Sequence, residues 1–487
     1  MRIDAIPRRW IAERPDSAAI REGDRLVTWR ELGKQIDACA KALVQAGVRP
    51  GDRVMIVAEN STPLVVSLFA TSAIDACAVI ANPRLSTREL DTMREHATPR
   101  RILFATGVAA EVDEHARRIG ATDIGRGLAM SALDAVAVPD EALAHDTSHL
   151  AAIVYTTGTS GRPKGVMLTH ANLLFVAETS ATLRDIGPAD RVFGALPIYH
   201  VYGLASMLLG SFTGGARLHV VARFDAQSAL DMLAHDGLTI FQGVPAMYAR
   251  MLERMPEGAR AEAPAIRYLY AGGSILDPKL KAAVEARFGC PLHNGYGLTE
   301  CSPTVSQTRL GHPRDDTSVG PPIPGVELHV EPSGELWVRG PNVMKGYYRD
   351  PEATAEAITP DGWLKTGDLA RIGDDGALFI TGRQKELIIR SGLNVHPVEV
   401  ETVLNAHPAV AQSVVVGRSM PDGNEEVVAF VEPARGRTVG ADELAAHAAA
   451  QLAPYKRPSQ IFVMDTLPAS PTGKVLRGKL KTMAQSR

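Results

Sequence analysis

The sequence predicts a large α/β protein that carries a smaller α+β domain at its C-terminal end. The chain has 487 residues, which is too long for one small domain. Over the first three quarters, short apolar runs typical of buried strands alternate with segments whose apolar residues recur at helical spacing. This alternation favours α/β layers built on largely parallel sheet. Between about residues 326 and 381 the pattern changes to short alternating strands with Gly and Asp turns, and a compact tail follows.

Each element in the first part is predicted from apolar spacing. The predicted strands are 53–58, 77–81, 102–105 and 151–155, and the predicted helices are 32–46 and 64–74. The most apolar stretch, residues 64–81, is interrupted by Asp75 and several small residues, so a core helix that runs into a strand fits better than a membrane span. We therefore expect no transmembrane segment, although peripheral association with a membrane stays open.

The last part of the chain predicts shorter elements. Strands are expected at 334–339 and 377–380. The tail is expected to contain helices at 397–405 and 442–452 and strands at 411–416, 427–431 and 460–464. These elements are enough for a small α+β domain. We place the boundary near residues 382–385, so the expected domains are residues 1–382 and 383–487.

Composition and charge exclude several classes of protein. Hydrophobic residues make up 45% and charged residues 22% of the chain, which are ordinary values for a globular protein. A formal charge of −3 argues against a nucleic-acid binder, since such proteins usually carry a basic excess or stripe. The four cysteines form no CxxC pair and show no zinc-ligand spacing, so reduced thiols are expected. The first fifteen residues lack an apolar core, which argues against a secretory signal and favours a cytoplasmic protein.

The strongest motif is a loop rich in glycine and hydroxyl side chains, YTTGTSGRPKG at residues 155–165. It follows a predicted strand and precedes a helical segment that begins near Thr169. Glycines let backbone N–H groups approach phosphate oxygens, hydroxyls donate hydrogen bonds and Lys164 adds positive charge, so the loop suits an oligophosphate. It is not a Walker A loop, because GxxxxGK[ST] is absent. A flexible Ser/Gly linker or a plain turn is the alternative.

Two further segments carry groups that a nucleotide site needs. In GYGLTE at residues 295–300, Tyr296 could stack on a flat base and Glu300 could hold Mg²⁺ that bridges phosphates. In WLKTGD at residues 363–368, Asp368 could accept hydrogen bonds from a ribose diol, and Arg383 could add a donor. Taken singly, the alternatives are a strand-end turn with a capping Glu, a turn Asp and a surface Arg.

Two single residues are also candidates. Lys474 lies in the turn PTGKVLR at residues 471–477, although a lone lysine in a tail is usually solvated surface. His200 lies between aromatic residues in PIYHVYG at residues 197–203, where a buried, hydrogen-bonded core histidine is the default interpretation.

Taken together and in this order, these segments resemble the adenylate-forming superfamily, which includes acyl-CoA synthetases, adenylation domains of peptide synthetases and firefly-type luciferases. The resemblance covers nearly the whole chain, from about residue 15 to residue 477. It implies a large N-terminal domain of layered α/β subdomains and a small, mobile α+β C-terminal lid domain. It also implies a ligase that uses ATP, Mg²⁺ and coenzyme A to convert a carboxylic acid first into acyl-AMP and pyrophosphate, and then into acyl-CoA and AMP.

The resemblance implies a nucleotide-binding role for each matched residue. Those that would wrap the β- and γ-phosphates are Thr156, Thr157, Gly158, Thr159, Ser160, Gly161 and Lys164. Those that would hold adenine are Gly272, Gly273, Ser274, Asn294, Gly295 and Tyr296. Asp368 and Arg383 would bind ribose, Thr299 would contact the α-phosphate, and Glu300 would bind the metal.

The resemblance also implies two positions of the lid. Lys474 would be the lid lysine that enters for adenylation and withdraws before the thiol attacks. Lys385 occupies the hinge position, and rotation there would bring Ser391 and Gly392 alongside the coenzyme A channel. A carboxylic acid is already an anion at neutral pH, so the first step needs positive charge from Lys474, Lys164 and Mg²⁺ more than it needs a base.

The substrate acid is predicted from the residues that would line its pocket: His200, Tyr202, Gln242, Gly243, Val244, Ala271, Gly272 and residues 297–303. Few of these could pair with a second carboxylate or an amine, which favours an apolar acid. Residues 199–202 are similar to those of 4-coumarate–CoA ligases, whereas residues 296–303 and 391–395 look more like medium- and long-chain fatty acyl-CoA synthetases. We expect a fatty acid first, with an aryl acid of the cinnamate or benzoate type as the alternative.

The expected partners are a small carboxylic acid and coenzyme A, without nucleic acid. One alternative is a standalone adenylating enzyme that loads an acyl carrier protein on another chain. Another is a non-catalytic nucleotide-binding protein, against which the joint presence of Lys474, Glu300 and Asp368 argues. A homodimer and a monomer both stay open.

Overall fold

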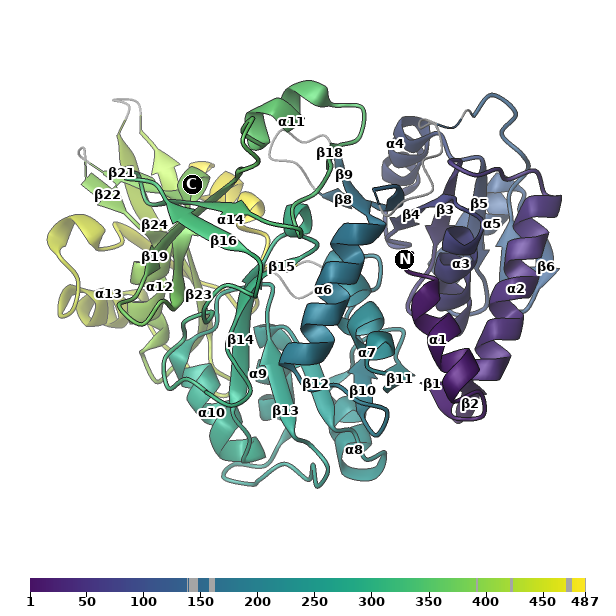
Figure 1. Cartoon of the computed structure of the whole chain (residues 1–487). Coiled ribbons are helices and arrows are strands. Elements are labelled where there is room, and N and C mark those ends of the chain that lie inside the picture. Colours follow the sequence, from purple (N-terminus) through teal and green to yellow (C-terminus); the bar gives the residue numbers. More distant parts are fainter. Residues whose placement is uncertain are drawn as a thin grey trace.

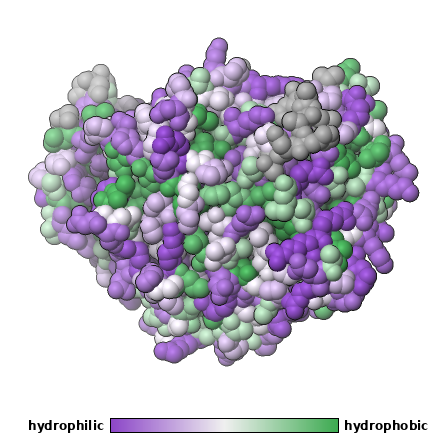
Figure 2. All heavy atoms as spheres, in the orientation of Figure 1, coloured by the Kyte–Doolittle hydropathy of each residue, from purple (hydrophilic) through white to green (hydrophobic). Residues whose placement is uncertain are grey.

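The computed structural model describes residues 1–137, 139, 148–156, 163–390, 393–420, 424–469 and 475–486, and it confirms the predicted α/β class (Figure 1). Within these residues, two eight-stranded sheets form the body of the protein, and sheets of four, two and three strands follow. None of the helices formed by these residues is long and apolar enough to cross a membrane. Hydrophilic and hydrophobic residues are intermixed over the face shown in Figure 2.

The N-terminal sheet has a parallel centre, in which β4, β3 and β5 lie side by side and β8 pairs with β4. The central strands β3 and β4 are buried along their whole length, as expected inside a parallel sheet. The strands, in spatial order, are β18 (Gly346–Tyr347), β9 (Lys164–Thr169), β8 (Leu150–Thr156), β4 (Cys77–Ala81), β3 (Arg53–Val57), β5 (Arg101–Ala105), β7 (Leu128–Met130) and β6 (Thr122–Gly125). The helices of this region are α2 (Trp29–Gln45), α3 (Thr62–Ala73), α4 (Thr87–Ala97) and α5 (Ala110–Ile119).

The most apolar stretch of the sequence is confirmed as a core helix followed by a strand, α3 and β4. Strand β9 is one of the strands that were not predicted: it lies between the glycine-rich loop and α6 and pairs antiparallel with β8. Its apolar run is only three residues long, between Gly165 and Thr169, which is too short to stand out as a strand.

The central sheet is parallel from β1 to β14 and closes with an antiparallel strand at each edge. Its strands, in spatial order, are β15 (Thr304–Gln307), β14 (Leu292–Gly297), β13 (Tyr268–Ala271), β12 (Ile240–Gly243), β10 (Arg191–Gly194), β11 (Arg217–Val220), β1 (Ala18–Glu22) and β2 (Arg25–Thr28). Its helices are α1 (Ala5–Glu13), α6 (His170–Leu183), the π-helix Tyr202–Leu209, α7 (Gly210–Thr213), α8 (Ala226–His235), α9 (Pro245–Arg254) and α10 (Pro278–Phe288).

Helix starts are set by side chains that satisfy free backbone N–H groups. The hydroxyl of Thr28 accepts from the backbone of Glu31, whose carboxylate accepts from the backbone of Thr28 in return. This capping box begins α2 at Trp29, three residues before the predicted start. Thr169 and Asn172 form the same reciprocal pair at the start of α6, where the sequence placed it.

The C-terminal part begins with a four-stranded antiparallel sheet and ends in a small α+β domain with its own core. All five elements predicted for the tail are present, and α12 has the predicted bounds. The first sheet contains β16 (Glu327–Val330), β17 (Glu335–Arg339), β19 (Leu364–Ile372) and β20 (Leu378–Arg383), with α11 (Pro351–Ala357) nearby in the sequence. The remaining elements are β21 (Ile388–Arg390), β22 (Leu393–Val395), α12 (Pro397–Asn405), β23 (Val410–Ser419), β24 (Glu425–Pro433), α13 (Ala441–Ala449), β25 (Gln460–Val463) and α14 (Arg477–Gln485).

A buried carboxylate, Asp190, ties together the amino ends of three parallel strands in the central sheet. It accepts hydrogen bonds from Arg267 Nε and Nη2 at 2.8 and 2.7 Å and from Thr239 Oγ1 at 2.7 Å. These three residues immediately precede β10, β13 and β12. Burial raises the pKa of Asp190, but the hydrogen bonds from Arg267, the Gly187 backbone and Thr239 outweigh it and hold the pKa below its usual value.

We expect Asp190→Asn to lower the free energy of unfolding at pH 7 by about 2 kcal/mol, because it leaves the Arg267 guanidinium without its carboxylate. Since the folded pKa is depressed, this stabilisation is complete above the unfolded pKa of about 3.9 and is lost as the pH falls through the folded value. In thermal melting at several pH values, the difference in stability between Asp190→Asn and the unmodified protein should shrink below about pH 4. Glu327→Gln, which removes an exposed pair with Arg339, is the control and should change stability by less than about 0.5 kcal/mol. An equal effect of both substitutions would contradict this role of Asp190.

Candidate active site

The predicted site residues gather where parallel strands of the central sheet end. β12 ends at Gly243, β13 at Ala271 and β14 at Gly297. In open α/β sheets, ligands bind beyond such carboxyl ends. Other predicted residues come from the hairpin of β8 and β9, the four-stranded sheet, the start of the π-helix and the 3-10 helix Gln384–Glu386.

Asp368 joins two of the segments that the sequence predicted for a nucleotide. Its carboxylate is buried, with 3% of the residue exposed. The Tyr296 hydroxyl donates to Oδ2 at 2.5 Å, and Arg383 Nε lies 2.8 Å from Oδ1. Asp368 and Arg383 face each other in the register of β19 and β20, so strand pairing fixes the ion pair. Because each carboxylate oxygen can accept more than one hydrogen bond, Asp368 can receive a ribose diol and keep both protein partners.

The protonation state of Tyr296 is fixed by its surroundings. Burial, and then the negative charge of Asp368, raise the pKa of the Tyr296 hydroxyl well above its usual value. The hydroxyl therefore remains a donor to Asp368 at neutral pH. The residue as a whole is half-buried, and an aromatic ring of this kind could stack on a flat base.

Glu300 and Lys164 meet at Tyr347, a residue that the sequence analysis missed. The Tyr347 hydroxyl donates to Glu300 Oε1 at 2.9 Å, and Lys164 Nζ lies 4.6 Å from the centroid of the Tyr347 ring. Pairing of β18 with β9 sets Tyr347 opposite Val166, close to Lys164. Burial and then the charge of Glu300 raise the pKa of Tyr347 above its usual value, so the hydroxyl stays protonated. No motif marks Tyr347, because it belongs to an ordinary GYY run.

The donor set around Glu300 fits Mg²⁺ that is held mainly by a substrate. Mg²⁺ is usually bound by one or two carboxylates together with substrate phosphates. Within the described parts of the chain, no three His, Cys, Asp or Glu side chains cluster as a metal site of their own. The partly exposed carboxylate of Glu300 is suited to complete such a site beside Lys164.

The residues predicted for the acyl site come from separate elements that meet around Tyr202. Tyr202 begins the π-helix and is 7% exposed, and its hydroxyl donates to Gly243 O at 3.4 Å. Its backbone N–H donates to His200 Nδ1 at 3.3 Å. His200 is exposed, so it is not the buried core histidine that was the default interpretation. Such π-helical turns occur frequently at functional sites.

Glycine is required where backbones approach closely at this site. A Cβ on Gly297 would lie 2.2 Å from Pro303 O, and one on Gly295 would lie 1.8 Å from the Tyr270 hydroxyl. A Cβ on Gly272 would just touch the rings of Tyr270 and Tyr202, at 3.4 and 3.5 Å. Gly272 therefore borders the aromatic wall formed by these two tyrosines.

The other predicted residues of the site lie in different environments. Gly273 and Ser274 are exposed after β13, and Thr299 is buried at the start of a short 3-10 helix, Thr299–Cys301. Asn294 is buried, and its amide nitrogen donates to the carbonyl oxygens of Thr317 and Ser318 at 3.0 and 3.3 Å. This amide is therefore occupied within the protein.

Two further predicted residues lie at the edges of the described segments. Thr156 ends β8 and pairs with Lys164, and Lys385 is exposed in the 3-10 helix Gln384–Glu386. The predicted residues that lie outside the described residues are Thr157, Gly158, Thr159, Ser160, Gly161, Ser391, Gly392 and Lys474.

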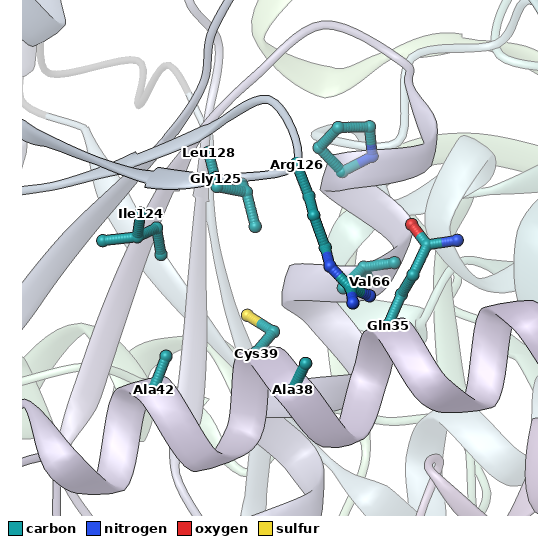
Figure 3. Close-up of a pocket in the computed structure, with 10 residues that line it drawn as sticks. Gln35, Ala38, Cys39, Ala42, Val66, Ile124, Gly125, Arg126 and Leu128 are labelled. Atoms are coloured by element: carbon teal, nitrogen blue, oxygen red, sulfur yellow. The ribbon is translucent and has the colours of Figure 1, made fainter.

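A pocket away from this site lies between α2 and the β6–β7 hairpin (Figure 3). Figure 3 shows Cys39 and Arg126 among its lining residues. Burial raises the pKa of the Cys39 thiol to about 12, so the thiol stays protonated at neutral pH and is a poor nucleophile. The remaining lining residues are Gln35, Ala38, Ala42, Pro63, Val66, Ile124, Gly125 and Leu128.

Comparison with known proteins identifies the family. Residues 7–348 match the AMP-binding enzyme family and residues 399–474 match the AMP-binding enzyme C-terminal domain. A feruloyl-CoA synthase of Amycolatopsis sp is 34% identical, with 96% of each chain covered. A 2-succinylbenzoate–CoA ligase of Geobacillus sp. (strain WCH70) is 33% identical, with 97% of each chain covered. The structure of ATP-bound MatB from Rhodopseudomonas palustris is 30% identical, covers 99% of both chains and gives a TM-score of 0.88. The chain therefore belongs to the AMP-binding enzyme family.

Proposed function

We propose that this chain joins an aryl carboxylic acid to coenzyme A through an acyl-AMP. As a member of the AMP-binding enzyme family, it is an AMP-forming acid–thiol ligase that uses ATP, Mg²⁺ and coenzyme A. The observation that carries the site assignment is the contact of Asp368 with Tyr296 and Arg383. It unites the segments predicted for adenine and for ribose around one buried carboxylate.

The choice of an aryl acid departs from the fatty acid that the sequence analysis preferred. The two relatives named above are a feruloyl-CoA synthase and a 2-succinylbenzoate–CoA ligase, and both of these names denote aryl acids. Tyr202 and Tyr270 support the same choice, because their ring centroids lie 6.1 Å apart in an edge-to-face pair beside Gly272. An aromatic wall of this kind packs well against a flat ring.

In the first step, a carboxylate oxygen attacks the α-phosphorus and the bond to pyrophosphate breaks. Lys164 would neutralise phosphate charge, while Asp368, Arg383 and Tyr296 would hold the nucleoside in place. Glu300 would bind Mg²⁺, which supplies positive charge between the phosphates when it is present. No protein base is required, since the acid is already ionised at neutral pH.

In the second step, the thiol sulfur of coenzyme A attacks the acyl carbon and the bond to AMP breaks. We assign Lys385 as the hinge about which the rest of the C-terminal domain turns between the two steps. In the present arrangement, Lys279 Nζ on α10 donates to the carbonyl oxygens of Asn405 and Ala406 at 2.9 and 2.6 Å. These carbonyls end α12, so this contact must break when the C-terminal domain turns.

Cinnamate, 4-hydroxycinnamate and benzoate should give at least tenfold higher kcat/KM for acyl-CoA formation than octanoate or palmitate. Lys474→Ala, which lies outside the described residues, should lower ATP–pyrophosphate exchange by about 100-fold or more, because a positive charge near the transferring group is lost. Both quantities can be measured with the purified protein, ATP, Mg²⁺ and coenzyme A. A preference for fatty acids would contradict the aryl assignment. Pyrophosphate release without acyl-CoA would point to a carrier protein instead.

Lys385→Pro should leave acyl-AMP formation within about threefold of normal and slow thioester formation by at least about tenfold, because proline removes rotation about φ at the hinge. Lys385→Ala is the matched control, since it removes the same amine but leaves the backbone free. Single-turnover assays of each half-reaction separate the two effects. Normal rates for both half-reactions in the proline variant would show that the chain does not turn at this residue.

A further inference from the structure

Arg184, at the end of α6, is a fully buried cation that has no carboxylate among its partners in the described residues. Its Nη1 donates to Gln242 Oε1 at 2.7 Å, and its Nη2 donates to Gln307 Oε1 at 3.1 Å. Nη1 and Nη2 also donate to the backbone oxygen and hydroxyl of Ser206, at 3.4 and 3.1 Å. Buried charges in proteins are normally paired with an opposite charge, because desolvation of a lone ion is costly. An arginine held only by neutral oxygens is therefore unusual.

The neighbours of Arg184 leave further donors without acceptors. A guanidinium can only donate, so both glutamine side chains must turn their oxygens toward it. Their amide nitrogens, Gln242 Nε2 and Gln307 Nε2, are buried and have no hydrogen-bond partner among the described atoms, and the same is true of Arg184 Nε. Gln242 and Gln307 are 0% and 1% exposed. The cluster is thus positively charged and rich in buried N–H donors.

This donor cluster borders the predicted acyl site. Gln242 is itself one of the residues predicted to line that site and immediately precedes Gly243, whose backbone oxygen accepts from Tyr202. The Arg184 guanidinium carbon lies 4.4 Å from the centroid of the Tyr270 ring, which forms the aromatic wall with Tyr202. Ser206 belongs to the π-helix that Tyr202 begins. The cluster therefore borders the aromatic wall at Tyr270 and the predicted acyl site at Gln242.

We propose that Arg184, Gln242 and Gln307 bind a second carboxylate, so that the preferred substrate is an aryl dicarboxylic acid. This inference rests on the proposed function and adds the chemical class of the acid. One carboxylate is activated by ATP, and the other, at the far end of the molecule, supplies the missing counter-charge and accepts from the unpartnered N–H groups. A site built to satisfy buried donors rejects an analogue that lacks the acceptor, because those donors then stay unpaired.

The sequence analysis reached the opposite expectation, an apolar acid, because it considered only residues that would line the pocket directly. Arg184 gives no signal in the sequence, since it follows an apolar helix and belongs to no motif. Only the tertiary fold places Arg184, the residue that follows α6, beside Gln242 on β12 and Gln307 on β15.

The test compares matched acids on the full-length protein by ATP–pyrophosphate exchange with Mg²⁺. The probes are cinnamate, 4-hydroxycinnamate and cinnamates that carry a second carboxylate at ring position 2, 3 or 4. We expect at least one diacid to exceed cinnamate at least tenfold in kcat/KM. Arg184→Met should lower the ratio of diacid to cinnamate kcat/KM at least tenfold, whereas Arg9→Met on the exposed face of α1 should leave that ratio unchanged.

The outcomes distinguish this inference from the function on which it rests. If cinnamate or 4-hydroxycinnamate exceeds every diacid in the unmodified protein, the second-carboxylate site is wrong and the ligase assignment stands. If the diacid preference is present but survives Arg184→Met in a folded variant, Arg184 does not provide it and the inference also fails. If no aryl acid supports exchange, both the inference and the aryl-acid ligase assignment fail. The first outcome is measured on the unmodified protein alone. The proposal can therefore be contradicted even if Arg184→Met does not fold.

Discussion

The site depends on one buried carboxylate, Asp368, that is held from two sides. Tyr296 reaches it from the end of β14 in the central sheet, and Arg383 reaches it from β20 in the four-stranded sheet. Burial makes the carboxylate dependent on these partners, because an unpaired buried charge is costly. The same contact joins the two sheets, and Arg383 is the last residue of β20, at the predicted start of the C-terminal domain. In the proposed assignment, nucleotide binding, the contact between the two sheets and the start of the lid therefore share one interaction.

The two ends of the parallel strands in the central sheet have different tasks. At the amino ends, Asp190 ties β10, β12 and β13 together and has no proposed role in chemistry. At the carboxyl ends, Gly295 lets the Tyr270 hydroxyl and Gly297 lets the Pro303 backbone approach so closely that no side chain would fit. Arg184 and its glutamines lie beside this edge as a cation without a counter-ion in the described residues. The amino ends thus carry a satisfied ion pair, whereas unsatisfied donors lie near the carboxyl ends, where we propose that a ligand binds.

Local patterns in the sequence predicted elements at the centre of the N-terminal sheet and in the C-terminal tail, because apolar spacing is a local property, whereas the strands of the central sheet were not predicted. The bounds of α12 and the helix-to-strand passage across residues 64–81 are confirmed. Strand β9 was missed because its apolar run is short. Tyr347 and Arg184 were missed for a different reason: their partners lie far away in the chain, and only the pairing of β18 with β9 or the packing of α6 reveals them. The roles of individual site residues remain predictions.

The most direct test of the account is the binding of ATP, with Mg²⁺ and without acid, to Asp368→Asn measured by titration calorimetry. We predict that the affinity for ATP falls at least tenfold. The amide of the variant offers one acceptor oxygen where the carboxylate offers two, and it lacks the negative charge that orders Arg383. The ATP affinity of Tyr296→Phe, which keeps the ring but not the hydroxyl, should lie between those of Asp368→Asn and the unmodified protein. If Asp368→Asn folds with a normal melting temperature and binds ATP as tightly as the unmodified protein, Asp368 is not a nucleotide ligand and the site has been placed wrongly.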